Sequence, residues 1–138
     1  LHQWLEFRRV LFRSKSDDFN SFYNILKKNL KSRHNVSPTH TVDELLRLNK
    51  LFKKDIVLYG AFLEDLMIGG VVNFATNEDV ILSFYISHDE EYQEYRPVNL
   101  LFYEILKDAI SNKFKILDFG IFTVEEEPNM GLDRKSVV

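Results

Sequence analysis

The sequence predicts an α+β fold, in which two helices precede an antiparallel three-strand meander, a crossover helix and a parallel return strand. Residues 80–87 form a β-branched and aromatic run of strand length. Pro97 suits the first position of a helix, because it lacks the N–H that a first turn leaves unpaired. A short strand predicted at residues 116–120 follows that helix closely, which favours a parallel crossover.

The first two elements are predicted as helices from apolar spacing and capping residues. Asp17 or Asp18 can cap a helix that begins at Phe19, and we expect that helix to end near residues 33–35. A capping box of Thr41 and Glu44 starts a second helix, which ends at residues 53–55. We expect the second helix to bury the apolar residues Val42, Leu45, Leu46, Leu48 and Phe52.

Three strands and a crossover helix follow. Residues 56–63 and 67–74 flank a turn at Glu64 and Asp65, and they are typical of an antiparallel hairpin. Gly69 and Gly70 indicate either a bulge or a close backbone approach. The acidic loop at 88–95 leads from the third strand to the helix that Pro97 begins.

Composition excludes several classes of function. The formal net charge is −3, and it falls to −6 when residues 1–14 and 133–138 are set aside, which argues against general nucleic-acid binding. The chain has no cysteine, so a thiolate metal site and a cysteine nucleophile are excluded. No apolar run reaches the ~20 residues of a membrane span. His34 and His40 have no companions that would form a metal site, so we expect no metal.

Both ends of the chain resemble translated sequencing adaptor. Leu11–Ser14 and Asp133–Ser136 can be encoded by two stretches that are nearly complete reverse complements of each other. We therefore divide the chain into 1–14 and 133–138, of adaptor origin, and 15–132, the native domain. The alternative for residues 5–14 is a genuine basic amphipathic segment. On the first interpretation both ends should be irregular, or helical by propensity alone.

Three stretches carry a family resemblance: LYGAFLEDLMIGGVV, FYISHDEEYQEYRPVNLLFYEIL and KILDFGIFTVEEEPNMGL. They resemble the acetyltransferase-like domain of the Fem-type group, relatives of peptidoglycan aminoacyltransferases that have the GNAT acyltransferase fold. This resemblance covers about residues 19–132. It implies that the domain is truncated, lacking a first strand before Phe19 and a helix and hairpin after Leu132. It also implies that such a fragment is inactive alone.

The resemblance implies transfer of an acyl or aminoacyl group to an amine of a cell-envelope or polysaccharide precursor, in the cytoplasm. The donor would be acyl-CoA or aminoacyl-tRNA, and the acceptor a small-molecule or lipid-linked amine. The donor arm would lie between the two splayed parallel strands. A non-catalytic domain that binds a sugar or a partner is the alternative. The sequence does not predict an oligomeric state.

Arg96, Pro97, Val98 and Asn99 are the predicted donor-binding residues, because an anion is favoured at a helix start by the dipole and by a guanidinium. The pyrophosphate loop of GNAT proteins usually contains glycines. This chain has none there, and Pro97 removes one N–H, which favours aminoacyl-tRNA or a binding module over coenzyme A. The alternative for Arg96 is a local pair with Glu94.

His88 and Asp118 are the predicted catalytic residues, because each ends a strand beside the expected cleft. The alternatives are a solvated loop histidine and a cap of the turn at Gly120. Three further residues are predicted to contact the substrate, with solvation or packing as their alternatives: Tyr85, Glu91 and Tyr95.

Overall fold

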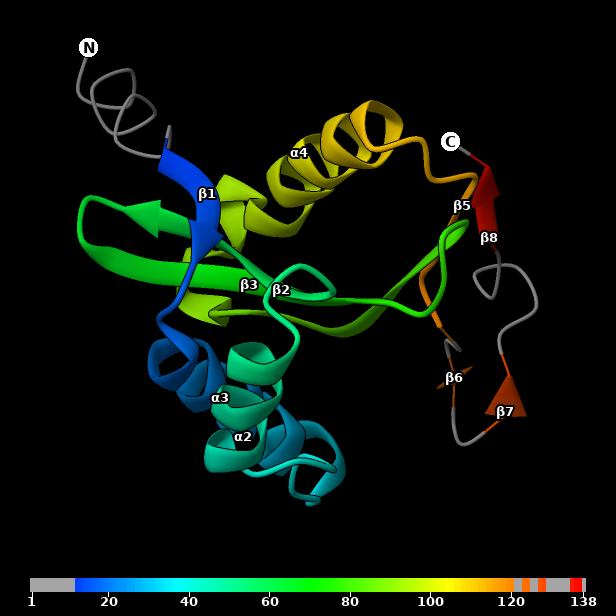
Figure 1. The fold of residues 1–138 in the computed structure, drawn as a ribbon. Helices are drawn as coiled ribbons and strands as arrows, with labels where there is room; N and C mark the ends of the chain where they lie inside the picture. The colour runs from blue at the N-terminus through cyan, green and yellow to red at the C-terminus, as the bar shows by residue number, and fades with distance from the viewer. Residues whose placement is uncertain (1–11, 121–122, 125–126, 129–134, 138) are drawn as a thin grey trace, which may run out of the picture.

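A mixed six-stranded sheet forms the centre of the protein, with helices on both faces (Figure 1). The computed structural model describes residues 12–120, 123–124, 127–128 and 135–137. The sheet order is β1-β2-β3-β4-β5-β8, and β6 pairs separately with β7. In chain order the elements are β1 (Phe12–Ser16), α2 (Phe19–His34), α3 (Val42–Leu51), β2 (Ile56–Leu63), β3 (Leu66–Ala75), β4 (Val80–His88), the 3₁₀ helix η1 (Glu90–Tyr95), α4 (Pro97–Ser111), β5 (Ile116–Asp118), β6 (Thr123–Val124), β7 (Glu127–Pro128) and β8 (Lys135–Val137).

Helices α2 and α3 lie on one face of the sheet and begin at the predicted caps (Figure 1). The Asp18 carboxylate accepts a hydrogen bond from the Ser21 N–H at 3.1 Å, and Thr41 and Glu44 form the reciprocal capping box. The expected burial of α3 is partly wrong. Leu45 is fully buried, but Leu46 and Phe52 are 36% and 50% exposed.

The meander of β2, β3 and β4 is antiparallel, as predicted, and both expectations for its glycines are met. A bulge lies between Ala61 and Phe62 of β2, opposite Gly69. At Gly70, an added Cβ would lie 2.5 Å from Cδ1 of Phe22, whose side chain is fully buried. Helix α2 can therefore approach the sheet because residue 70 has no side chain.

Helix α4 crosses the opposite face of the sheet and returns the chain as β5, parallel to β4. Pro97 occupies the first turn, as expected. Leu101, Ile105 and Ala109 are buried against the sheet. The two larger side chains, Leu101 and Ile105, each contribute about 1.5–3 kcal/mol on burial. The predicted order, a meander followed by a parallel return strand, is confirmed.

Both ends of the described chain join the sheet, contrary to expectation. Strand β1 pairs antiparallel with β2, and β8 pairs antiparallel with β5. Arg13 of β1 also forms a 3.0 Å ion pair with Glu104 of α4. The expectation of irregular ends is wrong for residues 12–14 and 135–137, and a first strand does precede Phe19. Residues 1–11 and 129–134 lie outside the described part, and the adaptor origin stays a prediction.

A buried phenol ties the sheet to α4. The Tyr59 hydroxyl of β2 donates to Oδ2 of Asp108 at 2.8 Å, and Lys15 Nζ lies 3.9 Å from the same oxygen. Burial, followed by the hydrogen bond and charge of Asp108, raises the pKa of Tyr59 above its ordinary value of 10.0. The phenol is therefore held protonated.

Gly70→Ala should lower the free energy of unfolding by about 1–3 kcal/mol, because Phe22 has no room to move away from the new methyl group. Urea unfolding would measure this loss. Gly60→Ala is the matched control, since its Cβ would meet the outer end of the half-buried Phe62 ring, at 2.8 Å. Equal losses in the two variants would contradict the close approach of α2.

The Tyr59–Asp108 contact should make stability depend on alkaline pH. A pKa raised on folding contributes stability that is complete below about pH 10 and is lost as the pH rises through the folded value. Unfolding free energy should therefore fall more steeply above pH 10 in the wild type than in Tyr59→Phe. Tyr103→Phe, which removes an exposed phenol, should keep the wild-type slope. Identical slopes in all three proteins would count against the contact.

Candidate donor site at the start of α4

The end of β4 and the start of α4 meet above Gly69 of β3. A Cβ placed at Gly69 would lie 3.1 Å from Pro97 Cβ and 3.3 Å from His88 Cβ. Both atoms approach the same point, so His88 and Pro97 lie on the same face of the sheet. A glycine at position 69 therefore allows a predicted catalytic residue and the helix start to come together.

Arg96 turns the chain into α4 through a left-handed conformation, with φ 49° and ψ 55°. A residue other than glycine pays roughly 1–2 kcal/mol for this region. The Arg96 N–H donates to the Gln93 carbonyl at 3.0 Å, which closes the 3₁₀ turn before the helix.

A cavity of about 260 Å³ lies at this helix start and is lined by His88, Gln93, Arg96, Pro97, Val98 and Asn99. The structure thus brings the four predicted donor-binding residues together with His88. Helix α4 has no side-chain cap, and the N–H groups of Val98 and Asn99 have no acceptor among the described residues. Unpaired N–H groups, the helix dipole and a guanidinium together favour an anion.

Arg96 is exposed and forms no ion pair with any residue in the described part of the chain. The predicted alternative, a pair with Glu94, is therefore not observed. The guanidinium is left available to a ligand at the helix start.

The outer edge of β4 is unpaired beside this cavity. Strand β5 pairs with β4 only over Val80 to Leu82, and in the described chain no other strand pairs with that edge as far as His88. Alternate residues between Ser83 and His88 therefore present unpaired backbone N–H and C=O groups on this side. An extended, amide-bearing molecule can pair with such an edge.

A second cavity, of about 190 Å³, lies between α2 and the end of β4. His88 lines this cavity as well as the first, together with Ser87, Asn29 and Arg33. The Asn29 amide donates to the Ser87 hydroxyl and to the His88 carbonyl, both at 2.6 Å. These bonds fix the end of β4 against α2, and they hold the backbone of His88, which borders both cavities.

An ion pair joins α2 to the acidic loop. Nη2 and Nε of Arg33 donate to Oε1 of Glu90, at 2.6 and 3.1 Å. The hydrogen bond and then the charge of Arg33 hold the pKa of Glu90 below its usual range. Both side chains are about half exposed, so the pair acts as a clasp on the loop more than as a source of stability.

Asp118 is not brought to this site. It pairs with Leu82, six residues before His88, so the two predicted catalytic residues lie roughly 20 Å apart along the strands. The expectation that the two strands end side by side is wrong. Oδ1 of Asp118 instead accepts from the Gly120 N–H at 2.9 Å, as the capping alternative predicts.

The three predicted substrate contacts are placed differently from one another. Glu91 is exposed in η1, near the cavity residue Gln93. Tyr95 is half-buried against the α4 side of the core and stacks on Tyr92, with ring centroids 6.4 Å apart. Tyr85 belongs to the core on the α2 side and is 7% exposed.

Sequence analysis missed the partner of Tyr85. His40, in the loop between α2 and α3, lies with Nδ1 2.8 Å from the Tyr85 hydroxyl. Phe84 packs edge-on to His40, with ring centroids 5.5 Å apart, and remains 39% exposed. The two partners are 45 residues apart, and no local pattern could have linked them. Within the described residues, no group of three or more possible metal ligands is found.

Comparison with known proteins identifies the fold. The family model for the acetyltransferase (GNAT) domain matches residues 4–128. The chain belongs to the GNAT acetyltransferase family. A search of curated proteins gave no significant match. No helix in the described residues is both long and apolar enough to cross a membrane.

Solved structures at 12–16% identity share the fold. The PaiA N-acetyltransferase of Thermoplasma acidophilum, solved with coenzyme A, has a TM-score of 0.62, 12% identity and coverage of 86% of this chain and 96% of its own. An N-acetyltransferase of Staphylococcus aureus Mu50 has a TM-score of 0.68 and 14% identity. The match covers 83% of this chain and 75% of the other. The aminoglycoside acetyltransferase meta-AAC0020 from an uncultured soil metagenomic sample, solved with sisomicin, has a TM-score of 0.61 and 16% identity. The match covers 83% of this chain and 78% of the other.

Arg33→Met should return the pKa of Glu90 toward the ordinary range, because it removes both the hydrogen bond and the charge that lower it. Carboxyl-selective NMR titration would follow the group. Arg47→Met, which removes an exposed arginine of α3, should leave the Glu90 titration unchanged. A wild-type Glu90 that titrates at its ordinary pKa would contradict the clasp.

Proposed function

We propose that this protein transfers an acyl or aminoacyl group to an amine of a cell-envelope or polysaccharide precursor, as its resemblance to the Fem-type group implies. The observation that carries the proposal is the 260 Å³ cavity that joins His88 to Arg96 and the uncapped start of α4. We place the reaction in the cytoplasm, where both candidate donors are made.

The donor's phosphates would lie at the start of α4. The Arg96 guanidinium and the N–H groups of Val98 and Asn99 are the available partners, and a phosphate takes charge-assisted bonds from both kinds of donor. Pro97 has no N–H to donate to a phosphate. Arg96 would therefore contribute a larger share of the donor affinity than an arginine beside a glycine-rich loop. Acyl-CoA is the first donor to test, since the PaiA relative was solved with coenzyme A.

The donor's arm would follow the unpaired edge of β4 from the helix start. Amide groups in the arm can pair with the N–H and C=O groups that β5 leaves free beyond Leu82. His88 lies at the phosphate end of this path, so it reaches the reactive carbonyl only when the arm folds back within the cavity that His88 shares with Arg96.

His88 would act as the general base. Its imidazole takes a proton from the attacking amine, the amine nitrogen bonds to the donor's carbonyl carbon, and the bond from that carbon to the leaving group breaks. The leaving thiolate or ribose oxygen takes up a proton, which balances the transfer. Glu91 and Tyr95, on η1, are proposed contacts for the acceptor.

Asp118 and Tyr85 are left out of the proposed site, because their polar atoms are already bonded elsewhere. Asp118 caps the turn at Gly120, and Tyr85 contacts His40 in the loop between α2 and α3. A non-catalytic binding module is the rival function. The absence of glycine from Arg96–Asn99 favours the rival, because a pyrophosphate contacts glycine backbones most closely.

Two substitutions should separate donor binding from chemistry. Arg96→Ala should weaken the affinity for acetyl-CoA by roughly tenfold, the lower end of what a charge-assisted bond contributes, because the side chain is exposed. His88→Ala should lower turnover by about 10²–10⁴ and leave donor affinity nearly unchanged. Calorimetry and a single-turnover assay with an amine acceptor would measure the two effects.

Arg47→Ala, which removes an exposed arginine from α3, is the control and should change neither quantity. The same assays with charged tRNA would distinguish the two donors. Donor affinity within about twofold of wild type in Arg96→Ala would refute the phosphate site. Failure of the wild type to bind or turn over either donor would favour the binding module.

A further inference from the structure

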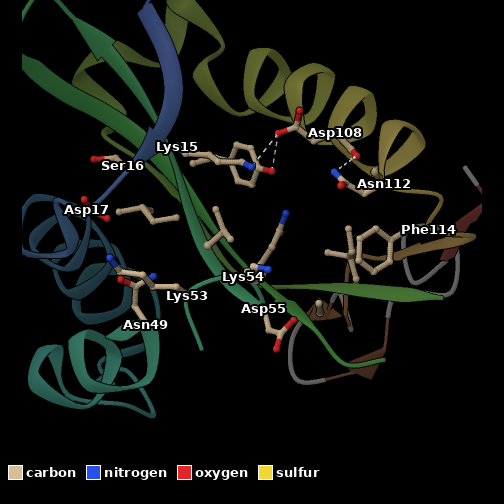
Figure 2. A pocket seen from close by; sticks show the side chains of 17 residues that line it. Lys15, Ser16, Asp17, Asn49, Lys53, Lys54, Asp55, Asp108, Asn112 and Phe114 are labelled. Carbon is tan, nitrogen blue, oxygen red and sulfur yellow. Dashed lines mark hydrogen bonds and ion pairs between the residues drawn. The ribbon is translucent and has the colours of Figure 1, made fainter. Parts of the chain in front are cut away.

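A cavity of about 520 Å³ lies at the opposite end of the sheet from the donor site, and Figure 2 shows the side chains that line it. It is bounded by the end of β1, the start of β2, the segment that follows α3, and the last turn of α4. This volume is within the range of natural small-molecule sites. Figure 2 shows Lys54 pointing into the same space that Asp108 and Asn112 face from α4.

Asn73, which lines the cavity, has side-chain N–H groups that no described residue accepts. Asn73 of β3 is 4% exposed, and its Oδ1 accepts from the Ser83 hydroxyl at 2.8 Å. No described residue accepts from the Asn73 side-chain N–H groups, although Asn73 lines the cavity. Among the described residues no buried side-chain nitrogen or oxygen lacks a partner, so the Asn73 amide nitrogen is accessible and can donate to a molecule in the cavity.

Hydrogen-bond acceptors line the same cavity. The Tyr59 hydroxyl donates to Asp108 and keeps its own oxygen as an acceptor. Asn112 donates through Nδ2 to the Asp108 carbonyl at 2.8 Å, which fixes its side chain and leaves Oδ1 free to accept. Lys54 forms no ion pair with any residue in the described ranges, so its ammonium adds a second donor.

The charges of the lining favour a neutral ligand over an ion. Lysines at 15, 53 and 54 are matched by aspartates at 17, 55 and 108. The C-terminal ends of α3 and α4 also lie beside the cavity, and their dipoles oppose an anion. Apolar side chains complete the walls, among them Val57, Ile81 and Phe114.

We propose that this cavity binds a neutral, hydroxyl-rich molecule of the saccharide class, at a site separate from the donor cavity. Hydroxyl groups both donate and accept, as the mixed lining of Asn73, Tyr59, Asp108 and Asn112 requires. The C–H face of a sugar ring suits the flat side of Phe114 and the neighbouring apolar walls.

Protein NMR can test this site directly. Titration with N-acetylglucosamine and with maltose should give saturable shifts of the Asn73 and Asn112 side-chain amide signals. Larger shifts of the backbone N–H signals of Val98 and Asn99, at the other end of α4, would place the saccharide at the donor site and count against the proposal. Inorganic phosphate, titrated in parallel, should produce no saturable shift at the cavity.

Two variants report on the lining. Asn112→Ala should weaken saccharide binding about three- to tenfold, the effect of one hydrogen bond, whereas Asn24→Ala, on the exposed side of α2, should not. Ala75→Phe should abolish binding by filling the cavity from β3, with the thermal midpoint serving as the check on folding. The proposal is overturned by the absence of a saturable saccharide shift, by saturation with phosphate instead, or by unchanged affinity in both cavity variants.

Discussion

The short parallel pairing of β4 with β5 is the constraint on which the arrangement of the site depends. It joins Val80–Leu82 to Ile116–Asp118 and then stops, while β4 continues to His88. Because a parallel connection needs a crossover, α4 has to begin near the end of β4 and run back along the sheet. The same pairing that requires the helix therefore places its N-terminus beside the free edge of the strand.

Much of the fold could be predicted because its determinants are local. The capping box at Thr41, the acidic cap at Asp18 and the proline at position 97 each depend on residues within one turn, so the helix starts were correct. The offset between β4 and β5 is a long-range property. No feature near Asp118 indicates that it will face Leu82, and the distance from His88 therefore could not be read from the sequence.

The other errors have similar causes. The apolar spacing predicts that Leu46 and Phe52 are buried. In α3, however, only Leu45 is fully buried, and the side chains of Leu46 and Phe52 extend beyond this contact into solvent. Both ends resemble translated adaptor, and this likeness predicts irregular structure without considering whether the residues can pair with the sheet. A bare edge on β2 offers hydrogen bonds to any segment that can extend beside it, and residues 12–16 do so.

Helix α4 touches both cavities, with Val98 and Asn99 lining one and Ala109 and Asn112 lining the other. Its 15 residues form a rod of about 22 Å whose two ends line the two cavities. A shift of the rod along its axis would change the shape of both cavities together. If a molecule in one cavity changed the affinity of the other cavity for its ligand, that ligand would change the affinity of the first cavity by the same factor.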